Sequence, residues 1–512
     1  MNFNKGIYVI IPLLAYMYLG TGIHTDDYIH LINNTDWTLI QLLTLNITNN
    51  PKIFVSIPTF YYDFIQHYVF NGEMFYYDLV KAVTSIICIV LIYPFAKTYM
   101  NSFKALYFST LFVLFPLHDS TNYSTINHHY IIVPALSMYS HYLLTIGRLK
   151  TGFITAFFAS FWSYVSPPFI FGLSIIFFRK RKIKEFFLYI FPAVLYFSYF
   201  IYISTIFDIN RIFIGRINSI EIIFKHFLLQ LATFGDTFIG PSFWLKLYFS
   251  IMELSLFSLG VGVIITYLFI KNVQLCKVPI SRDLLYSSFC ILFISFIMFS
   301  LTGRYPQIAF NLGNRVTIYG SFFLAINIIM FFMSNKKTFL PVFLVLLFSI
   351  LGISDHWKNW EVEKQNIFEN ISSNEKLTEI NADDLLFVSY NHYSQLGKIS
   401  HVELFPDKVN ANAIFMLAKR MHFNVFPINK RFFMDDDILM DRKFKTKIKI
   451  GESIYVYNSS NDNIIQIPKE KINDYISDLP LDTRHWVQLL NNNKFIGKIV
   501  IYLMPRVKYA FL

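Results

Sequence analysis

The sequence predicts an all-α polytopic membrane protein with about 11 transmembrane helices and a small C-terminal α/β domain outside the membrane. Of the 512 residues, 54% are hydrophobic and 19% are aromatic, which is more than a soluble domain of this size can keep off its surface. Uncharged runs repeatedly reach the roughly 17–25 residues that cross a bilayer as a helix. Near Asp355 the composition becomes polar and charged. We therefore expect a transmembrane domain over residues 1–354 and a soluble domain over residues 355–512.

Ten apolar runs predict the membrane helices. They lie at residues 6–23, 79–96, 105–117, 130–147, 151–178, 186–207, 254–270, 284–303, 316–335 and 338–354. As one helix, the run 151–178 would extend roughly 42 Å at about 1.5 Å per residue, too long for one crossing. Ser166-Pro167-Pro168 also interrupts it. We interpret it as a hairpin whose turn lies within the membrane depth beside protein or a wet cavity, which gives eleven spans.

The basic residues indicate the orientation. With eleven spans, every basic cluster between apolar runs falls on one side, and the positive-inside bias makes that side cytoplasmic. The N-terminus is then inside and the C-terminus outside. The stretch after Lys5 has no small-residue cleavage site, so we expect a retained first helix. Because the net charge of +11 is spread over such clusters, it does not indicate nucleic-acid binding.

Other features complete the predicted organisation. The three cysteines lie in or beside apolar segments, which excludes a disulfide framework and a cysteine metal site. Amphipathic stretches at 37–45 and 53–70, with a third at 222–231, predict helices lying in the membrane interface. In the tail, residues 383–390 and 453–457 predict strands and 410–421 a helix.

The first candidate site is the acidic motif His24-Thr25-Asp26-Asp27-Tyr28, directly after the first apolar run. Charges beside membrane helices are costly unless water, a partner or a reaction needs them. We predict that one of Asp26 and Asp27 is the general base for an acceptor hydroxyl, while the other orients that hydroxyl or contacts a donor sugar. The alternative is that they are solvated loop charges or cap a helix. His24 and Tyr28 are expected to line the same cavity.

A second cluster, His118-Asp119 with Asn127-His128-His129, leads into the run 130–147. Its spacing matches no zinc motif, so we expect His118, Asp119, His128 and His129 to line a polar cavity, or to sit at the wet interface, rather than to bind a metal.

Arg304 and Arg315 bracket a short outer loop, against the positive-inside tendency. Guanidinium groups hold phosphate by two parallel hydrogen bonds, so we predict donor-phosphate binding, with snorkelling toward headgroups as the alternative. Lys246 is expected to pair with Glu253.

Together these motifs resemble the GT-C-type glycosyltransferases, which take a sugar from a polyprenyl-phosphate carrier on the outer face of the membrane. The resemblance rests on Thr25-Asp26-Asp27-Tyr28, on the proline hairpin at Pro167-Pro168, and on Asn314-Arg315-Val316 opening a late span. Within that group the chain is most similar to bacterial serotype-converting O-antigen glucosyltransferases.

The resemblance implies transfer of a hexose, glucose foremost, from a polyprenyl-phosphate-linked donor to an extracytoplasmic glycan, such as the O-antigen of lipopolysaccharide, or to a lipid-linked glycan. It also implies contact with membrane lipids and a bacterial inner membrane, with the C-terminal domain in the periplasm. No cofactor is implied, and a need for a divalent cation stays open.

Other classes of function compete with this one. An O-antigen polymerase or ligase also uses outer arginines, but places its large soluble loop between late spans. A lipid-linked glycan flippase or another transporter predicts inverted repeats and charges within spans, and neither is evident in the sequence. A sensor or anchored protein with inert spans would not need so many of them.

Overall fold

The computed structural model describes residues 3–24, 26–33, 73–206, 220–272, 281–302, 305–333, 335–380, 384–390, 393–421, 423–442, 446–480, 486 and 498. The chain divides into two compact units. The helical unit comprises Met1–Gly22 and Asp36–Trp357, and the C-terminal unit comprises Ile23–Thr35 and Lys358–Leu512. The domains predicted from the sequence were 1–354 and 355–512. The units differ from this prediction in that the short N-terminal segment Ile23–Thr35 belongs to the C-terminal unit. The interfacial stretches 37–45 and 53–70 lie outside the described residues.

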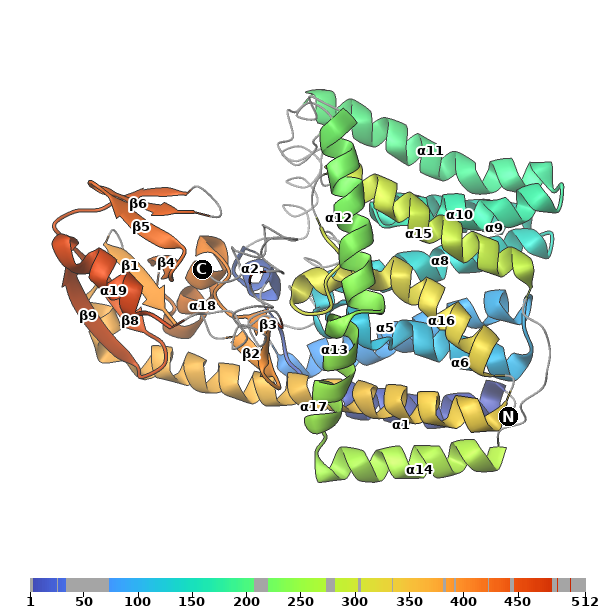
Figure 1. Cartoon of the computed structure of the whole chain (residues 1–512), viewed down its shortest axis with the longest axis horizontal. Helices are drawn as coiled ribbons and strands as arrows, with labels where there is room; N and C mark the ends of the chain where they lie inside the picture. Colours follow the sequence, from blue (N-terminus) through green and yellow to red (C-terminus); the bar gives the residue numbers. More distant parts are fainter. Residues whose placement is uncertain are drawn as a thin grey trace. The chain divides into compact units, whose positions relative to one another are not determined.

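Every apolar run predicted to span the membrane forms a helix. These helices are α1 (Phe3–Tyr18), α5 (Met74–Lys97), α6 (Ser102–Val113), α8 (His129–Thr145), α9 (Leu149–Trp162), α10 (Ser166–Arg179), α11 (Ile183–Ile206), α14 (Leu256–Asn272), α15 (Arg282–Thr302), α16 (Ile318–Phe332) and α17 (Lys336–Ser373). In Figure 1 their segments within the helical unit run in a common direction, whereas α12 (Ile220–Phe238) and α13 (Pro241–Met252) run across them. The crosswise α12 contains the predicted interfacial stretch 222–231.

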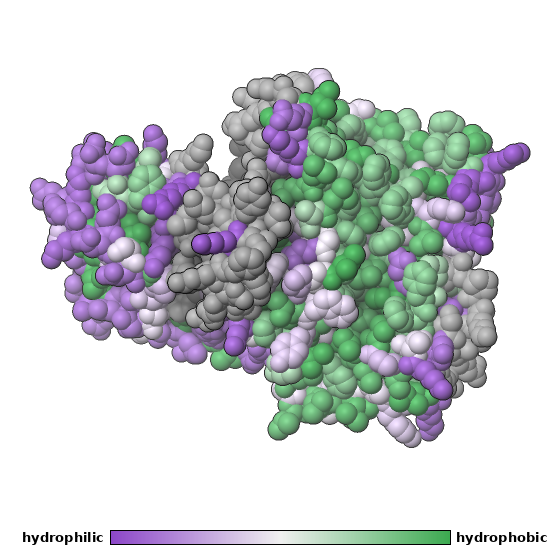
Figure 2. Space-filling view, viewed as in Figure 1, coloured by the Kyte–Doolittle hydropathy of each residue, from purple (hydrophilic) through white to green (hydrophobic). Residues whose placement is uncertain are grey.

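Six segments of the described chain are long and apolar enough to cross a membrane, and one of them is the pair α12–α13. Many large apolar side chains on these helices face outward, for example Phe187 at 61% exposed and Phe289 at 58%. Figure 2 shows this apolar surface over the sides of the helices, and polar side chains over the sheets of the C-terminal unit. Exposed apolar surface of this extent indicates contact with lipid. The chain is therefore mostly helical, with the character of a membrane protein.

The proline pair ends one helix and starts another, as predicted. Pro167 and Pro168 occupy the first turn of α10, where their missing N–H groups cost nothing. The turn at residues 163–165 is covered by protein: Val165 is buried, and the hydroxyl of Tyr319 donates to its carbonyl over 3.2 Å. The broken backbone at this turn thus finds a partner within the protein, as the predicted hairpin requires.

A buried ion pair fixes the chain where it leaves α1. The two carboxylate oxygens of Asp78 accept from the amides of Gly20 (2.7 Å) and Gly22 (3.0 Å), and the ammonium of Lys81 lies 3.0 Å from the same carboxylate. Gly20 and Gly22 have φ of +83° and +60°, where glycine has no Cβ penalty. Lys81 is the one charged residue of the apolar run 79–96, and it is buried together with Asp78 just before that run. The other partners of this pair are backbone groups and the hydroxyl of Thr21, which indicates a structural role.

Side-chain contacts mark the two ends of the helical unit. At one end, the Nε of Arg179 lies 2.9 Å from Asp283, and the Nζ of Lys180 lies 5.2 Å from the ring of Tyr99. At the other end, the link between α6 and α8 contacts the loop before α16. That link contains the short helices η2 (Pro116–His118), α7 (Ser120–Tyr123) and η3 (Thr125–His128), and the loop contains η5 (Leu312–Thr317). This second end carries His118, His128, His129 and Arg315.

The C-terminal unit is a small α/β fold around a four-stranded sheet of order β4-β1-β8-β9. The central strand β1 (Leu385–Ser389) is parallel to β4 (Asn424–Ile428) and to β8 (Ser453–Asn458), and β9 (Asn463–Pro468) is antiparallel to β8. The two predicted strands and the predicted helix are confirmed as β1, β8 and α18 (Lys408–Lys419). The remaining elements are α2 (Asp26–Asn33), η6 (Glu375–Glu379), the hairpin β2 (Tyr393–Leu396) and β3 (Ile399–Glu403), the meander β5 (Phe432–Asp435), β6 (Ile438–Asp441) and β7 (Lys447–Lys449), η7 (Lys469–Lys471) and α19 (Ile472–Asp478).

Candidate functional site

The loop before α16 places Arg315 among polar and aromatic side chains. We call Arg315 together with Asn127, His129, Tyr130 and Tyr305 the Arg315 centre. The guanidinium donates through Nη1 to the Oδ1 of Asn127 over 3.0 Å. Its central carbon lies 5.8 Å from the ring centroid of Tyr130 and 5.9 Å from that of Tyr305. The side chain is half-buried, so the cation is oriented without being enclosed. Such a group can bind phosphate in a charge-assisted way.

Tyr130 links this arginine to His129 and to the turn between α9 and α10. The ring centroids of His129 and Tyr130 are 4.5 Å apart, and the hydroxyl of Tyr130 is hydrogen-bonded to that of Tyr164. The Nδ1 of His129 lies 2.8 Å from the carbonyl of Ile126. Its Nε2 is buried and has no hydrogen-bond partner among the described residues, and the same is true of the Nδ2 of Asn127. The Arg315 centre therefore has unused polar atoms beside its cation.

Asn314, the residue before Arg315, belongs to a second polar group, which we call the Asp119 centre. In this group both oxygens of the Asp119 carboxylate accept hydrogen bonds. Oδ1 accepts from the Nζ of Lys246 over 2.7 Å and from the Nδ2 of Asn314, and Oδ2 accepts from the Nε1 of Trp357 over 2.9 Å. Ser120 completes the group by donating to the Oδ1 of Asn314. Lys246 is fully buried, and Asp119 is 2% exposed. The expected pairing of Lys246 with Glu253 is thus wrong, because its ion pair is with Asp119.

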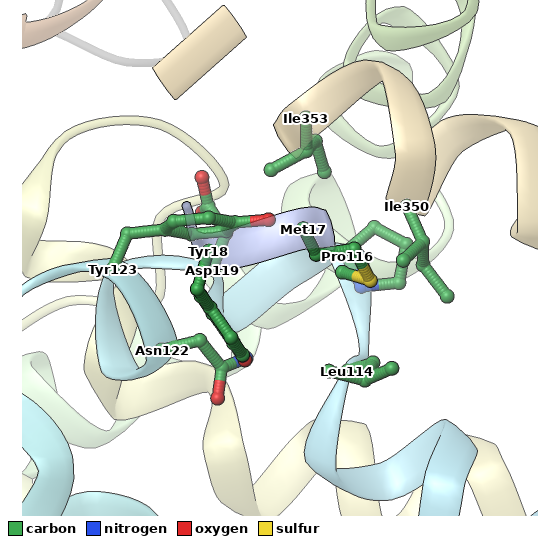
Figure 3. A pocket seen from close by; sticks show the side chains of 9 residues that line it. All are labelled: Met17, Tyr18, Leu114, Pro116, Asp119, Asn122, Tyr123, Ile350 and Ile353. Atoms are coloured by element: carbon green, nitrogen blue, oxygen red, sulfur yellow. The ribbon is translucent and has the colours of Figure 1, made fainter. Parts of the chain in front are cut away.

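The Asp119 centre lines a small cavity of about 10 Å³, room for about one water molecule. Figure 3 shows Asp119, Asn122 and Tyr123 on one side of it, and Ile350 and Ile353 of α17 on the other. This space is too small for a sugar. The carboxylate therefore positions Asn314, and with it the loop that carries Arg315, rather than acting on a substrate.

The remaining predicted histidines of this end are buried. His118 packs its ring 6.2 Å from that of Phe115, and the Nε2 of His128 lies 3.4 Å from the carbonyl of Asn122. Burial lowers the pKa of each imidazole to about 3, because the charged form loses its hydration. Both residues are neutral at physiological pH. No group of three or more His, Cys, Asp or Glu side chains gathers to hold a metal among the residues that the structure describes.

The acidic motif belongs to the C-terminal unit, where Asp27 is fully buried at the start of α2. Its Oδ2 accepts from the amide of His24 over 3.0 Å, and its own amide donates to the carbonyl of His24 over 3.0 Å. The carboxylate of Asp27 thus caps the free amide of His24, as the acidic residue of a capping box does. The alternative interpretation, a helix cap, therefore applies to one carboxylate oxygen of Asp27, Oδ2. The side chain of Asp26 lies outside the described part of the chain, as does Arg304.

Lys364, on the C-terminal part of α17, contacts this motif and the residue before it. Its ammonium donates to the carbonyl of Ile23, lies 2.8 Å from the Nδ1 of His24 and 3.4 Å from the hydroxyl of Tyr28, and pairs with Glu361 at 2.5 Å. An ammonium can only donate, so the Nδ1 of His24 must be the acceptor and the imidazole proton sits on Nε2. Burial, and then the charges of Glu361 and Asp27, raise the pKa of the Tyr28 hydroxyl well above its usual value. His24, Asp27 and Tyr28 thus lie together in one buried cluster.

Sequence reasoning missed Lys364 and Glu361, which occur in a polar stretch that resembled any solvated helix face. It also missed Tyr130 and Tyr164, and it named Asn314 only as part of the motif Asn314-Arg315-Val316, without a role of its own. The adjacency of Asn314 to Arg315, and of Tyr130 to His129, was the available signal for two of them.

No protein-family model and no curated protein matches this chain. The assignment of function therefore depends on the chemistry of the Arg315 centre and of the acidic motif.

Proposed function

We propose that this protein is a GT-C-type membrane glycosyltransferase that moves a hexose, glucose foremost, from a polyprenyl-phosphate carrier to an extracytoplasmic glycan such as O-antigen. The proposal includes eleven spans, a cytoplasmic N-terminus and a periplasmic C-terminal unit in a bacterial inner membrane. The observation that carries it is Arg315, a half-buried guanidinium held by Asn127 and two tyrosine rings at the end of an apolar helix. A lipid-linked phosphate needs a cation where apolar helices end.

The distribution of charge along the helices supports the proposed orientation. The end with Arg179 and Lys180 carries the basic links between helices, as cytoplasmic ends do. The Arg315 centre lies at the opposite end, because α16 starts beside Arg315 and returns to the basic link at Lys336 and Lys337. This polarity would expose the Arg315 centre to the outer leaflet.

The proposed reaction needs two chemical tasks. The acceptor hydroxyl loses its proton to a carboxylate and forms a bond to the anomeric carbon, while the bond from that carbon to the phosphate oxygen breaks. Negative charge then develops on the lipid phosphate, which Arg315 stabilises. Because one oxygen of Asp27 accepts the amide of His24, Asp27 suits the orienting role, and we assign the general base to Asp26.

The test is transfer of labelled glucose from polyprenyl-phosphate glucose in membranes that contain the full chain. We expect Asp26→Asn and Arg315→Ala to lose transfer while the amount of inserted protein stays normal, and Asp27→Asn to lose less than Asp26→Asn. Lys225→Ala is the matched control, because it removes a charge whose only ion pair in the described chain, with Glu221, is about 70% exposed on both sides. Undiminished transfer by the double variant Asp26→Asn, Asp27→Asn would remove the proposed base.

A further inference from the structure

We infer that His129 binds a hydroxyl of the transferred sugar through its Nε2, and so makes the Arg315 centre select a glycosyl phosphate over a bare lipid phosphate. The inference rests on the proposed function and deepens it. It assigns the phosphate and the sugar of one donor to two different side chains.

The first step is the position of the imidazole proton. The Nδ1 of His129 lies 2.8 Å from the carbonyl oxygen of Ile126. A carbonyl can only accept a hydrogen bond, so Nδ1 must carry the proton. In the neutral ring the lone pair then sits on Nε2. His129 therefore offers an acceptor on its other side.

The second step is that this acceptor is buried and unused within the protein. The Nε2 atom has no hydrogen-bond partner among the described residues. Leaving a buried polar atom unsatisfied costs roughly 1–3 kcal/mol, so such atoms usually have a partner, whether protein, water or ligand. The ring is also held in place by Ile126 and by the rings of Tyr130 and Tyr164.

The third step is the chemistry of the missing partner. It must be a hydrogen-bond donor, which excludes the oxygens of an ionised phosphate. A sugar hydroxyl is such a donor. Arg315 and His129 both flank Tyr130, at 5.8 Å from the guanidinium carbon and 4.5 Å between ring centroids. Arg315, the cation for the phosphate, and His129, the acceptor for a hydroxyl, thus both lie beside the ring of Tyr130.

The experiment measures binding of two lipids to the purified full chain in lipid nanodiscs: polyprenyl-phosphate glucose and polyprenyl phosphate. We expect the wild type to bind the glucose-bearing lipid about tenfold more tightly than the bare one, as one hydrogen bond allows. His129→Phe keeps a ring but removes the acceptor, so it should bind both lipids equally, with affinity for the bare lipid unchanged. His129→Gln, whose Oε1 can replace Nε2, should keep part of the preference.

Deoxyglucose donors identify the hydroxyl and control for misfolding. In the wild type one deoxy donor should bind as weakly as the bare lipid, whereas in His129→Phe that donor and intact glucose should bind alike. A full preference for glucose in His129→Phe would overturn the inference and leave the role of Arg315 intact. Failure of the wild type to bind either lipid, with no transfer in membranes, would instead overturn the proposed function.

Discussion

The Asp119 and Arg315 centres occupy neighbouring positions in the helical unit, yet they differ in how their polar atoms are used. Both oxygens of Asp119 accept hydrogen bonds from protein groups, and the carboxylate and the ammonium of Lys246 are buried together. Arg315 is half-buried, and the groups around it include unused atoms on Asn127 and His129. A closed centre positions the chain, whereas an open one can bind a ligand.

The largest effect on stability is expected at the closed centre. Lys246→Met leaves Asp119 as a buried charge without its cation, which should cost about 3–5 kcal/mol of unfolding free energy. Asp119→Asn combined with Lys246→Met removes both charges and should cost less than Lys246→Met alone. Thermal unfolding in detergent measures both, with the exposed Lys225→Met as control. A change below about 1 kcal/mol for Lys246→Met would contradict a closed, buried pair.

The largest effect on activity is expected at the open centre. Arg315→Ala should lower transfer about 100-fold, because it removes a donor to the developing phosphate charge, and it should barely change the unfolding temperature. Arg315→Lys keeps the charge but not the planar fork, so it should recover only part of the activity. Equal losses of stability in Arg315→Ala and Lys246→Met would remove the distinction between the two centres.

Buried histidines add a pH dependence of stability at the same end of the helical unit. With burial, the pKa of His118 and His128 falls to about 3, against about 6.5 in the unfolded chain. Between these values the unfolded chain binds more protons, so stability is full above about pH 6.5 and is lost as the pH falls. At pH 5.5 each residue should cost about 1.4 kcal/mol. Unfolding measured from pH 7.5 to 5.5 should show a smaller loss in His128→Gln, and an equal loss would contradict its buried neutral state.

The smallest effect is expected on the surface of α12. Lys225 and Glu221 form an ion pair at 2.6 Å, but both side chains are about 70% exposed. Exposed pairs contribute little to stability, because water screens both charges. Glu221→Gln should therefore leave both transfer and the unfolding temperature nearly unchanged, which makes it the baseline for the three larger changes.

The helices were predictable because their signal is local. A run such as 79–96 carries its own apolar composition, and the proline pair at 167–168 carries its own break. The strand β1 was likewise evident from its short apolar run, and β8 from its β-branched and aromatic residues. Arg315 was singled out because the predicted topology places it on the outer side, where a positive charge opposes the usual bias.

The partners within the candidate sites were not predictable, because they come from distant parts of the chain. Lys364 meets His24 across 340 residues, and Trp357 meets Asp119 across 238. No local pattern distinguishes these residues from solvated ones. The proton position on His129 depends on the carbonyl of Ile126, which only the fold places within reach. Sequence thus indicated which residue types matter, and the structure determined which atoms are occupied.

The most direct test of the central claim is photocrosslinking to the full chain in lipid bilayers. The probe is a polyprenyl phosphate with a photoreactive group beside its phosphate, and the labelled peptides are then mapped. We predict that labelling concentrates in residues 125–130 and 305–317 and is competed away by polyprenyl-phosphate glucose. Labelling that avoids both segments and is insensitive to the competitor would contradict an open phosphate-binding centre at Arg315.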